Sequence, residues 1–173
     1  MYMDLSDEEL ALKFKETSDT KFFEILMNRY KDRIYNFVMR YLSQREDCED
    51  ITEDVFVKIY FKIYSFDSSK AKFSTWIFTI AKNSVYNKLK ERKLLSLNYD
   101  VVDEKMVNND YDDIVQNGLN KLDKKYRIVL LMYYMEGFKY EEISQILKIP
   151  INTVKTRIKR AKEFLKNEIK DYI

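Results

Sequence analysis

Glycine and proline are scarce in this chain, with only two glycines and one proline among 173 residues. Sheets and long irregular loops depend on tight turns, and tight turns draw heavily on these two residue types. A chain with so few of them can reverse direction sharply in few places, whereas helices joined by short polar connections need almost none. The composition therefore predicts an all-α protein.

The residue inventory argues against several classes of function. The chain contains no histidine, no metal-spaced cysteines, no glycine loop that would cradle a phosphate and no serine-based catalytic motif. The carboxylates of Asp50, Glu53 and Asp54 could in principle bind a metal, but carboxylates in the first turns of a helix more often interact with the helix dipole. We therefore expect no enzyme, and no metal, cofactor or small-molecule substrate.

A single cysteine, Cys48, excludes an internal disulfide. The first thirty residues hold no apolar run long enough for a signal peptide or a membrane span. A cytoplasmic protein without membrane insertion of its own is the expectation.

The net charge of +2 conceals an uneven distribution. Residues 1–93 carry 17 basic and 16 acidic side chains, residues 94–115 carry one and six, and residues 116–173 carry 13 and 7. The acidic segment is rich in Asn and Asp and lacks a helical period. It is predicted to be a linker (94–115) between two small helical domains, 1–93 and 116–173.

The segment Tyr140–Lys162 is typical of two short helices separated by a turn at residues 148–150. The apolar positions of its first helix are Ile143, Ile146 and Leu147, and those of its second are Val154, Ile158, Ala161 and Leu165. Pro150 cannot continue the first helix, but it can begin the second. A basic amphipathic helix can simply be solvated, yet the short preceding helix and the tight turn favour a DNA-binding helix-turn-helix.

Three long helices are expected in the first domain, over residues 21–42, 47–64 and 73–93. The inward candidates of the third are Trp76, Ile77, Ile80, Ala81 and Leu89, and its outward stripe is Lys82, Asn83, Tyr86, Asn87, Lys90 and Lys93. Cations, amides and an aromatic ring together can hold phosphates, bond base edges and stack on an unpaired base. The alternative for the tyrosine is half-buried packing.

Three segments of the chain resemble a known family. DITEDVF (50–56), FSTWIFTIAKN (73–83) and LMYYMEGFKYEEISQILKIPINTVKTRIKRAK (131–162) are similar to regions two and four of a small bacterial RNA polymerase sigma factor of the extracytoplasmic-function group. In that family, region two binds the clamp helices of core polymerase and melts the minus-ten promoter element. Region four binds the polymerase flap and reads the minus-thirty-five element in the major groove. The resemblance implies promoter-specific transcription initiation.

The resemblance also assigns residues. The core-polymerase-binding helix would carry Asp50, Glu53, Asp54 and Phe56. The minus-ten element would be contacted by Phe66, Ser69, Lys72, Lys82, Asn83, Tyr86, Asn87 and Lys90. The minus-thirty-five element would be contacted by Asn152, Thr153, Lys155, Thr156, Arg157, Lys159 and Lys162. The implied partners are core RNA polymerase and promoter DNA, and the resemblance also suggests an anti-sigma factor.

Several positions depart from the family pattern. Lys148 occupies a turn position where glycine is usual, so either a lysine tolerates a positive φ or the turn differs. Lys139 replaces the usual Ser or Thr cap, which would leave Glu142 without its capping-box partner. Ser144 replaces a customary alanine at a close helix crossing, and Asn152 falls where glycine is frequent.

The main alternative is a stand-alone helix-turn-helix regulator. Its amino-terminal helices would dimerise or sense a ligand, and it would bind a palindromic duplex without polymerase.

Overall fold

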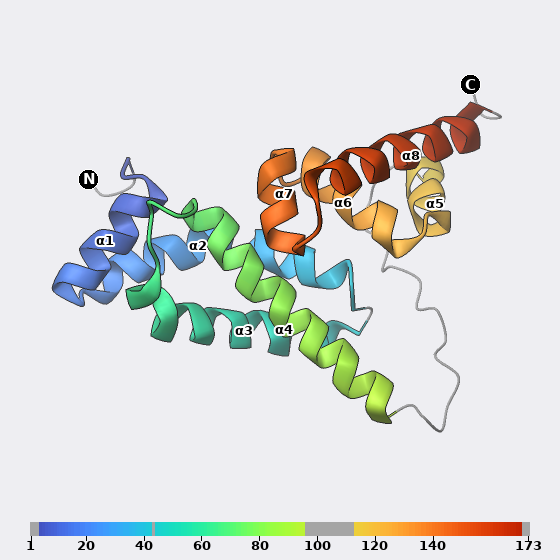
Figure 1. Cartoon of the computed structure of the whole chain (residues 1–173). Coiled ribbons are helices and arrows are strands. Elements are labelled where there is room, and N and C mark those ends of the chain that lie inside the picture. The colour runs from blue at the N-terminus through green and yellow to red at the C-terminus, as the bar shows by residue number, and fades with distance from the viewer. Residues whose placement is uncertain (1–3, 43, 96–112, 171–173) are drawn as a thin grey trace. The chain divides into compact units, whose positions relative to one another are not determined.

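The computed structural model describes residues 4–42, 44–95 and 113–170, and every regular element within these ranges is a helix (Figure 1). The prediction of an all-α fold is confirmed. The chain divides into two compact units, residues 1–104 (unit 1) and 105–173 (unit 2). The division falls inside the predicted acidic linker, most of which lies outside the described residues. Residues 94–95 and 113–115 of that predicted linker are helical.

Unit 1 contains α1 (Asp7–Thr17), α2 (Thr20–Met39), α3 (Arg45–Lys62), the short 3₁₀ helix η1 (Ile63–Ser65) and α4 (Phe73–Leu95). The three long helices agree with those expected from periodicity, with ends that differ by a few residues. Helix α1 was not predicted. Its sequence signal is a capping box, in which Ser6 Oγ accepts from the Glu9 backbone N–H and the Glu9 carboxylate accepts from the Ser6 backbone N–H at 2.7 Å.

Aromatic side chains fill much of the core of unit 1. Phe14, Phe37, Phe73 and Phe78 are almost completely buried. Phe37 and Phe78 join α2 to α4 through an edge-to-face ring contact with centroids 5.2 Å apart. Each such ring contributes about 1.5–3 kcal/mol by leaving water, so the core and not helix propensity holds α2 and α4 together.

Unit 2 contains α5 (Asp113–Lys121), α6 (Lys124–Tyr134), α7 (Tyr140–Leu147) and α8 (Ile151–Lys170). Its buried apolar side chains include those of Val129, Met132, Phe138, Ile143, Ile146, Val154, Ile158 and Ala161. A Cβ atom at Gly118 would lie 3.0 Å from Leu165 Cδ2, so glycine allows α5 to approach α8 closely. No helix among the described residues is both long and apolar enough to span a membrane.

Candidate nucleic-acid interface

The turn between α7 and α8 is tight and depends on a left-handed lysine. Lys148 has φ 54° and ψ 46°, and its backbone N–H donates to the Ser144 carbonyl. Ser144 Oγ donates to the Ile149 carbonyl at 2.6 Å, and the Pro150 carbonyl accepts the first bonds of α8. Of the two expectations for Lys148, the positive φ is therefore the one observed. The serine hydroxyl, expected only to be small, also closes the turn.

The start of α7 keeps half of a capping box. Glu142 Oε2 accepts from the Lys139 backbone N–H at 2.8 Å. A lysine side chain has no acceptor atom with which to return that bond to the helix. The glutamate therefore has a backbone partner even though the usual Ser or Thr hydroxyl is missing, and α7 begins at the residue that the motif predicts.

Helix α8 separates a buried face from an exposed one, as its periodicity predicts. Val154, Ile158 and Ala161 are buried and Leu165 is half-buried. The residues assigned to DNA lie on the other side: Asn152, Lys155, Thr156, Lys159 and Lys162 are exposed, and Thr153 and Arg157 are half-buried. The five exposed residues face outward as their helical spacing predicts, while the contacts of all seven with DNA stay a prediction.

The polar groups of this face differ in what they can offer a ligand. Thr156 Oγ1 donates to the Asn152 carbonyl at 2.8 Å, so its oxygen retains lone pairs that can accept. Lys159 lies 3.9 Å from Glu163 in an exposed pair, which is worth little in water. Lys162 Nζ lies 5.8 Å from the centroid of the Tyr134 ring, and its hydrogen bond to Tyr134 raises the lysine pKa. Lys162 is therefore partly engaged within unit 2.

A shallow basic concavity lies beside this face, where the first turn of α6 meets the first half of α8. Its volume is about 450 Å³. Its lining residues are Lys125, Tyr126, Asn152, Thr153, Thr156, Arg157 and Arg160. Arg160 Nη1 donates to Tyr126 Oη at 3.3 Å, and this hydrogen bond lowers the tyrosine pKa. The concavity thus brings three cations to one hollow, which suits a phosphate group.

Sequence analysis did not assign Lys125, Tyr126 or Arg160 to the site. The first two lie on α6, about 30 residues before the partners they meet on α8. The periodicity of a helix shows which of its faces is buried but not which other helix packs against it. The sequence therefore did not indicate that α6 and α8 meet, and only the packing of unit 2 brings them together.

Helix α4 presents an outward stripe in unit 1, with one exception. Asn83, Tyr86, Asn87 and Lys90 are exposed as predicted, and the Lys93 side chain lies outside those that the structure describes. The prediction that Lys82 faces outward is wrong: its residue is only 7% exposed, and its Nζ lies 5.5 Å from the Tyr86 ring centroid. Tyr86 follows Lys82 by four positions, so the two lie on the same side of the helix and the lysine stem can lie against the ring. Tyr86 itself is 48% exposed, so its ring packs against Lys82 and Tyr41 while part of the side chain remains open to solvent.

The loop of residues 66–72, which precedes α4, has an aromatic anchor and a polar tip. Phe66 is 5% exposed, with its ring centroid 5.2 Å from that of Phe73 and 5.4 Å from that of Trp76. Phe66 is therefore part of the core and presents no free ring, which corrects its expected role as a DNA contact. Ser69 and Lys72 are exposed. Asp67 Oδ1 accepts from the Ser69 backbone N–H at 3.0 Å, and its hydrogen bonds to Ser69 lower its pKa.

Helix α3 carries the residues assigned to core polymerase. Asp50 and Glu53 are exposed, while Asp54 and Phe56 are half-buried, and Asp54 forms an ion pair with Lys58. The same outward face continues with large apolar side chains that sequence analysis did not single out. They are Val57, Tyr60 and Phe61 on α3 and Tyr64 on the adjoining η1, and Phe61 is 74% exposed. The sequence signal is weak, because α3 has apolar residues on both faces and the pattern alone cannot tell which face is core.

Comparison with known proteins identifies the two halves separately. The family pattern described as Sigma-70 region 2 matches residues 26–94. The pattern described as Sigma-70, region 4 matches residues 112–165. The first covers most of α2 through α4, and the second ends on α8, so both include the surfaces described above.

Whole-chain relatives agree with these matches. The chain is 31% identical to the ECF RNA polymerase sigma factor SigW of Bacillus subtilis (strain 168), over 92% of this chain and 95% of that protein. It is 28% identical to the ECF RNA polymerase sigma-E factor of Escherichia coli (strain K12), over 98% of this chain and 97% of that protein.

Solved structures share the fold. The sigma factor RpoE from Bartonella quintana, solved in complex with the anti-sigma factor NepR, aligns with a TM-score of 0.74 at 23% identity, over 87% of this chain and 98% of that one. CnrH, solved in complex with the cytosolic domain of CnrY, aligns with a TM-score of 0.70 at 22% identity, over 95% of this chain and 97% of that one. From its matches to both sigma-70 regions and its full-length relatives, this chain belongs to the extracytoplasmic-function (ECF) group of RNA polymerase sigma factors.

Proposed function

We propose that this sigma factor binds core RNA polymerase through α3 and directs it to promoters through two DNA-binding surfaces. Helix α8 of unit 2 reads the minus-thirty-five element, and α4 with the loop of residues 66–72 in unit 1 melts the minus-ten element. The observation that carries the proposal is the α7–turn–α8 motif, whose exposed face is basic while its opposite face is buried. The stand-alone regulator is not favoured, because both sigma-70 regions match this one chain.

On α8, base reading and phosphate binding are assigned to different side chains. Asn152 and Thr156 lie near the start of the helix, where they can offer amide and hydroxyl groups to base edges. Lys155 and Lys159 are exposed cations on this face and contact phosphate. The remaining residues assigned to the minus-thirty-five element lie beside this face: Thr153, Arg157 and Lys162.

The concavity between α6 and α8 adds a phosphate site to this surface. Lys125, Arg157 and Arg160 surround the hollow, and the Tyr126 hydroxyl is held there by Arg160. A phosphate seated in it would fix how deeply α8 enters the major groove, because phosphate contacts set register and orientation.

In unit 1, Asn83, Tyr86, Asn87 and Lys90 form the surface for the melted minus-ten strand. The exposed face of Tyr86 can stack on an unpaired base, and the amides can bond its edge. Ser69 and Lys72 contribute from the loop. Lys82 and Phe66 support this surface from within, Lys82 against Tyr86 and Phe66 beneath the loop.

Core polymerase docks on the outward face of α3. Asp50 and Glu53 supply carboxylates at one end, while Val57, Phe61 and Tyr64 supply an exposed apolar strip at the other. Apolar groups surrounded by charges are typical of a protein–protein interface, and exposed aromatic side chains are its usual anchors. Each DNA contact is small, so holding both units on one polymerase raises the effective concentration of the second contact.

We also propose a cytoplasmic location and an anti-sigma partner. One solved structure of the same fold was captured with an anti-sigma factor, NepR, and the other with the cytosolic domain of CnrY. The exposed apolar strip of α3 is a surface that such a partner would cover in competition with polymerase.

The division of labour on α8 is tested with single alanine variants of the full chain in complex with core polymerase. Lys155→Ala should weaken binding to every promoter and lower the salt slope of log K by about 0.9. Asn152→Ala should cost roughly 1–3 kcal/mol on promoters with one particular base and little on others. Lys170→Ala, at the exposed end of α8, is the charge-matched control. A sequence-selective loss for Lys155→Ala, or a uniform loss for Asn152→Ala, would reverse the assignments.

A further inference from the structure

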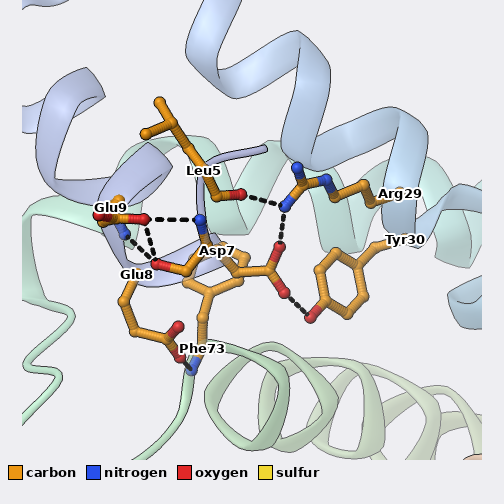
Figure 2. Close-up of polar contacts among 8 residues, drawn as sticks. Leu5, Asp7, Glu8, Glu9, Arg29, Tyr30 and Phe73 are labelled. Atoms are coloured by element: carbon orange, nitrogen blue, oxygen red, sulfur yellow. Dashed lines mark hydrogen bonds and ion pairs between the residues drawn. The ribbon is translucent and has the colours of Figure 1, made fainter. Parts of the chain in front are cut away.

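Helix α1 is fixed firmly to α2 by a polar cluster at its first turn (Figure 2). Arg29 Nη1 donates to Asp7 Oδ1 at 2.7 Å and to the Leu5 carbonyl at 2.9 Å. Tyr30 Oη donates to the other carboxylate oxygen of Asp7. Because these groups are partly buried, the ion pair is less screened than one on the open surface. The position of α1 relative to α2 is therefore fixed, and other side chains of α1 can hold neighbouring segments in place.

Two other side chains of α1 reach the two ends of the loop of residues 66–72. Lys15 Nζ donates to the Phe66 carbonyl at 2.8 Å. Glu8 Oε1 accepts from the Phe73 backbone N–H at 2.8 Å (Figure 2). Phe73 is the first residue of α4, where backbone N–H groups have no partner within the helix and a negative charge is favoured. A carboxylate 65 residues earlier in the chain thus caps α4.

Between these anchors the loop and α1 border a hollow. A cavity of about 160 Å³ separates them, lined by Glu8, Glu9, Leu12, Lys15, Phe66 and Ser68. Side chains do not fill this space, so packing alone does not fix the loop against α1. Beyond Phe66 the loop is organised by its own Asp67–Ser69 hydrogen bonds. Phe66 holds the loop to α4 through its ring contacts with Phe73 and Trp76, and the two polar contacts at the loop's ends hold it to α1.

We propose that Glu8 and Lys15 are positioning residues, which hold the loop in the conformation that receives the unpaired base of the minus-ten strand. The inference rests on the proposed assignment of this loop to the melted promoter. Holding the loop in advance spares the binding step the entropy of ordering it, so base capture becomes stronger and more selective. Neither residue needs to touch DNA.

The test uses full-length variants bound to core polymerase. Glu8→Ala and Lys15→Met remove one anchor each, Glu8→Gln keeps an acceptor oxygen, and Lys15→Arg keeps a cationic donor. Glu16→Ala, an exposed change on the same helix, is the control. The substrate is a preformed bubble of a promoter that the wild-type holoenzyme opens. It is compared with bubbles in which each minus-ten base in turn is replaced by an abasic site.

Wild-type holoenzyme should lose affinity when one particular base is missing. Glu8→Ala and Lys15→Met should reduce that discrimination by about tenfold, the effect expected of one charge-assisted hydrogen bond. The conservative variants and Glu16→Ala should retain it, and core affinity should be unchanged. In the free protein, hydrogen exchange at the Phe73 amide should accelerate in Glu8→Ala but not in Glu16→Ala.

Two results would overturn the inference, and they differ in what else they overturn. If wild-type holoenzyme is indifferent to every abasic site, the loop does not bind a base and the proposed minus-ten role fails with it. If wild-type discriminates and Glu8→Ala and Lys15→Met discriminate equally well, the positioning role alone is wrong and the proposed function stands.

Discussion

Two buried tyrosines of unit 1 should respond in opposite directions to loss of the hydroxyl. Tyr41 is 7% exposed, and its Oη has no hydrogen-bond partner among the described residues. Tyr30 is 3% exposed, and its Oη donates to the Asp7 carboxylate. Burial, the larger cause, raises the pKa of both, and the bond to Asp7 raises that of Tyr30 further. Substitution by phenylalanine removes only the oxygen from each ring.

The expected magnitudes follow from these partners. A buried polar group without a partner costs about 1–3 kcal/mol, so Tyr41→Phe should stabilise unit 1 by about 1 kcal/mol. A hydrogen bond to a charged group contributes about 1.5–3 kcal/mol, so Tyr30→Phe should destabilise it by about 1.5 kcal/mol. The destabilisation expected for Tyr30→Phe is at the low end of this range, because the Arg29 guanidinium, 2.7 Å from Asp7 Oδ1, still pairs with the carboxylate.

Trp76 makes the assay specific for unit 1. It is the only tryptophan of the chain and lies on α4, so its fluorescence during urea unfolding follows that unit. With a slope of about 1–3 kcal/mol per molar urea, a change of 1 kcal/mol moves the midpoint by roughly 0.3–1 M. Destabilisation of Tyr41→Phe to the same extent as Tyr30→Phe would show that the Tyr41 hydroxyl is bonded, and would refute the reasoning.

Three further predictions concern single positions. Lys148→Gly should stabilise unit 2 by about 0.5–1 kcal/mol, because it relieves about 1–2 kcal/mol of left-handed backbone strain and this exceeds the cost of the extra conformational entropy that glycine gives the unfolded chain. Lys148→Ala keeps the strain and should give no gain. Hydrogen exchange in α7 and α8 measures the stability of both variants. The Asp123 pKa is lowered by its bond to the Lys125 backbone N–H, so its stabilisation of α6 is present above its ordinary value of 3.8 and lost as the pH falls toward the lowered one. Circular dichroism should show a smaller acid loss in Asp123→Asn. Asn87→Ala should slow promoter opening more than it weakens closed-complex binding in stopped-flow assays, and equal effects would exclude base reading by Asn87.

Local periodicity was sufficient for much of the fold. The apolar spacing in α2 and α8 gave the buried faces, and Pro150 marked the start of α8. Helix α1 was not predicted, because its 11 residues bury only Leu10, Ala11 and Phe14, too few to show a clear period, and its main signal is the capping-box pair Ser6 and Glu9.

The contacts that sequence reasoning could not supply are those made between distant segments. Lys15 bonds to Phe66, 51 residues later, and no local rule pairs a particular lysine with a particular carbonyl. Lys82 shows the same limit on one helix. It was assigned to the outward stripe, but its same-face neighbours Phe78 and Val85 are fully buried, so Lys82 lies at the edge of the buried face with its Nζ 5.5 Å from the Tyr86 ring centroid.

Core binding followed by promoter melting tests the proposed function most directly. Purified chain is mixed with sigma-free bacterial core RNA polymerase and promoter fragments, and unpaired thymines are detected by permanganate reactivity. The prediction is a stable complex with core polymerase and reactive thymines in the minus-ten region that appear only when both proteins are present. Failure to bind core polymerase, together with tight binding of the chain alone to duplex DNA, would contradict it.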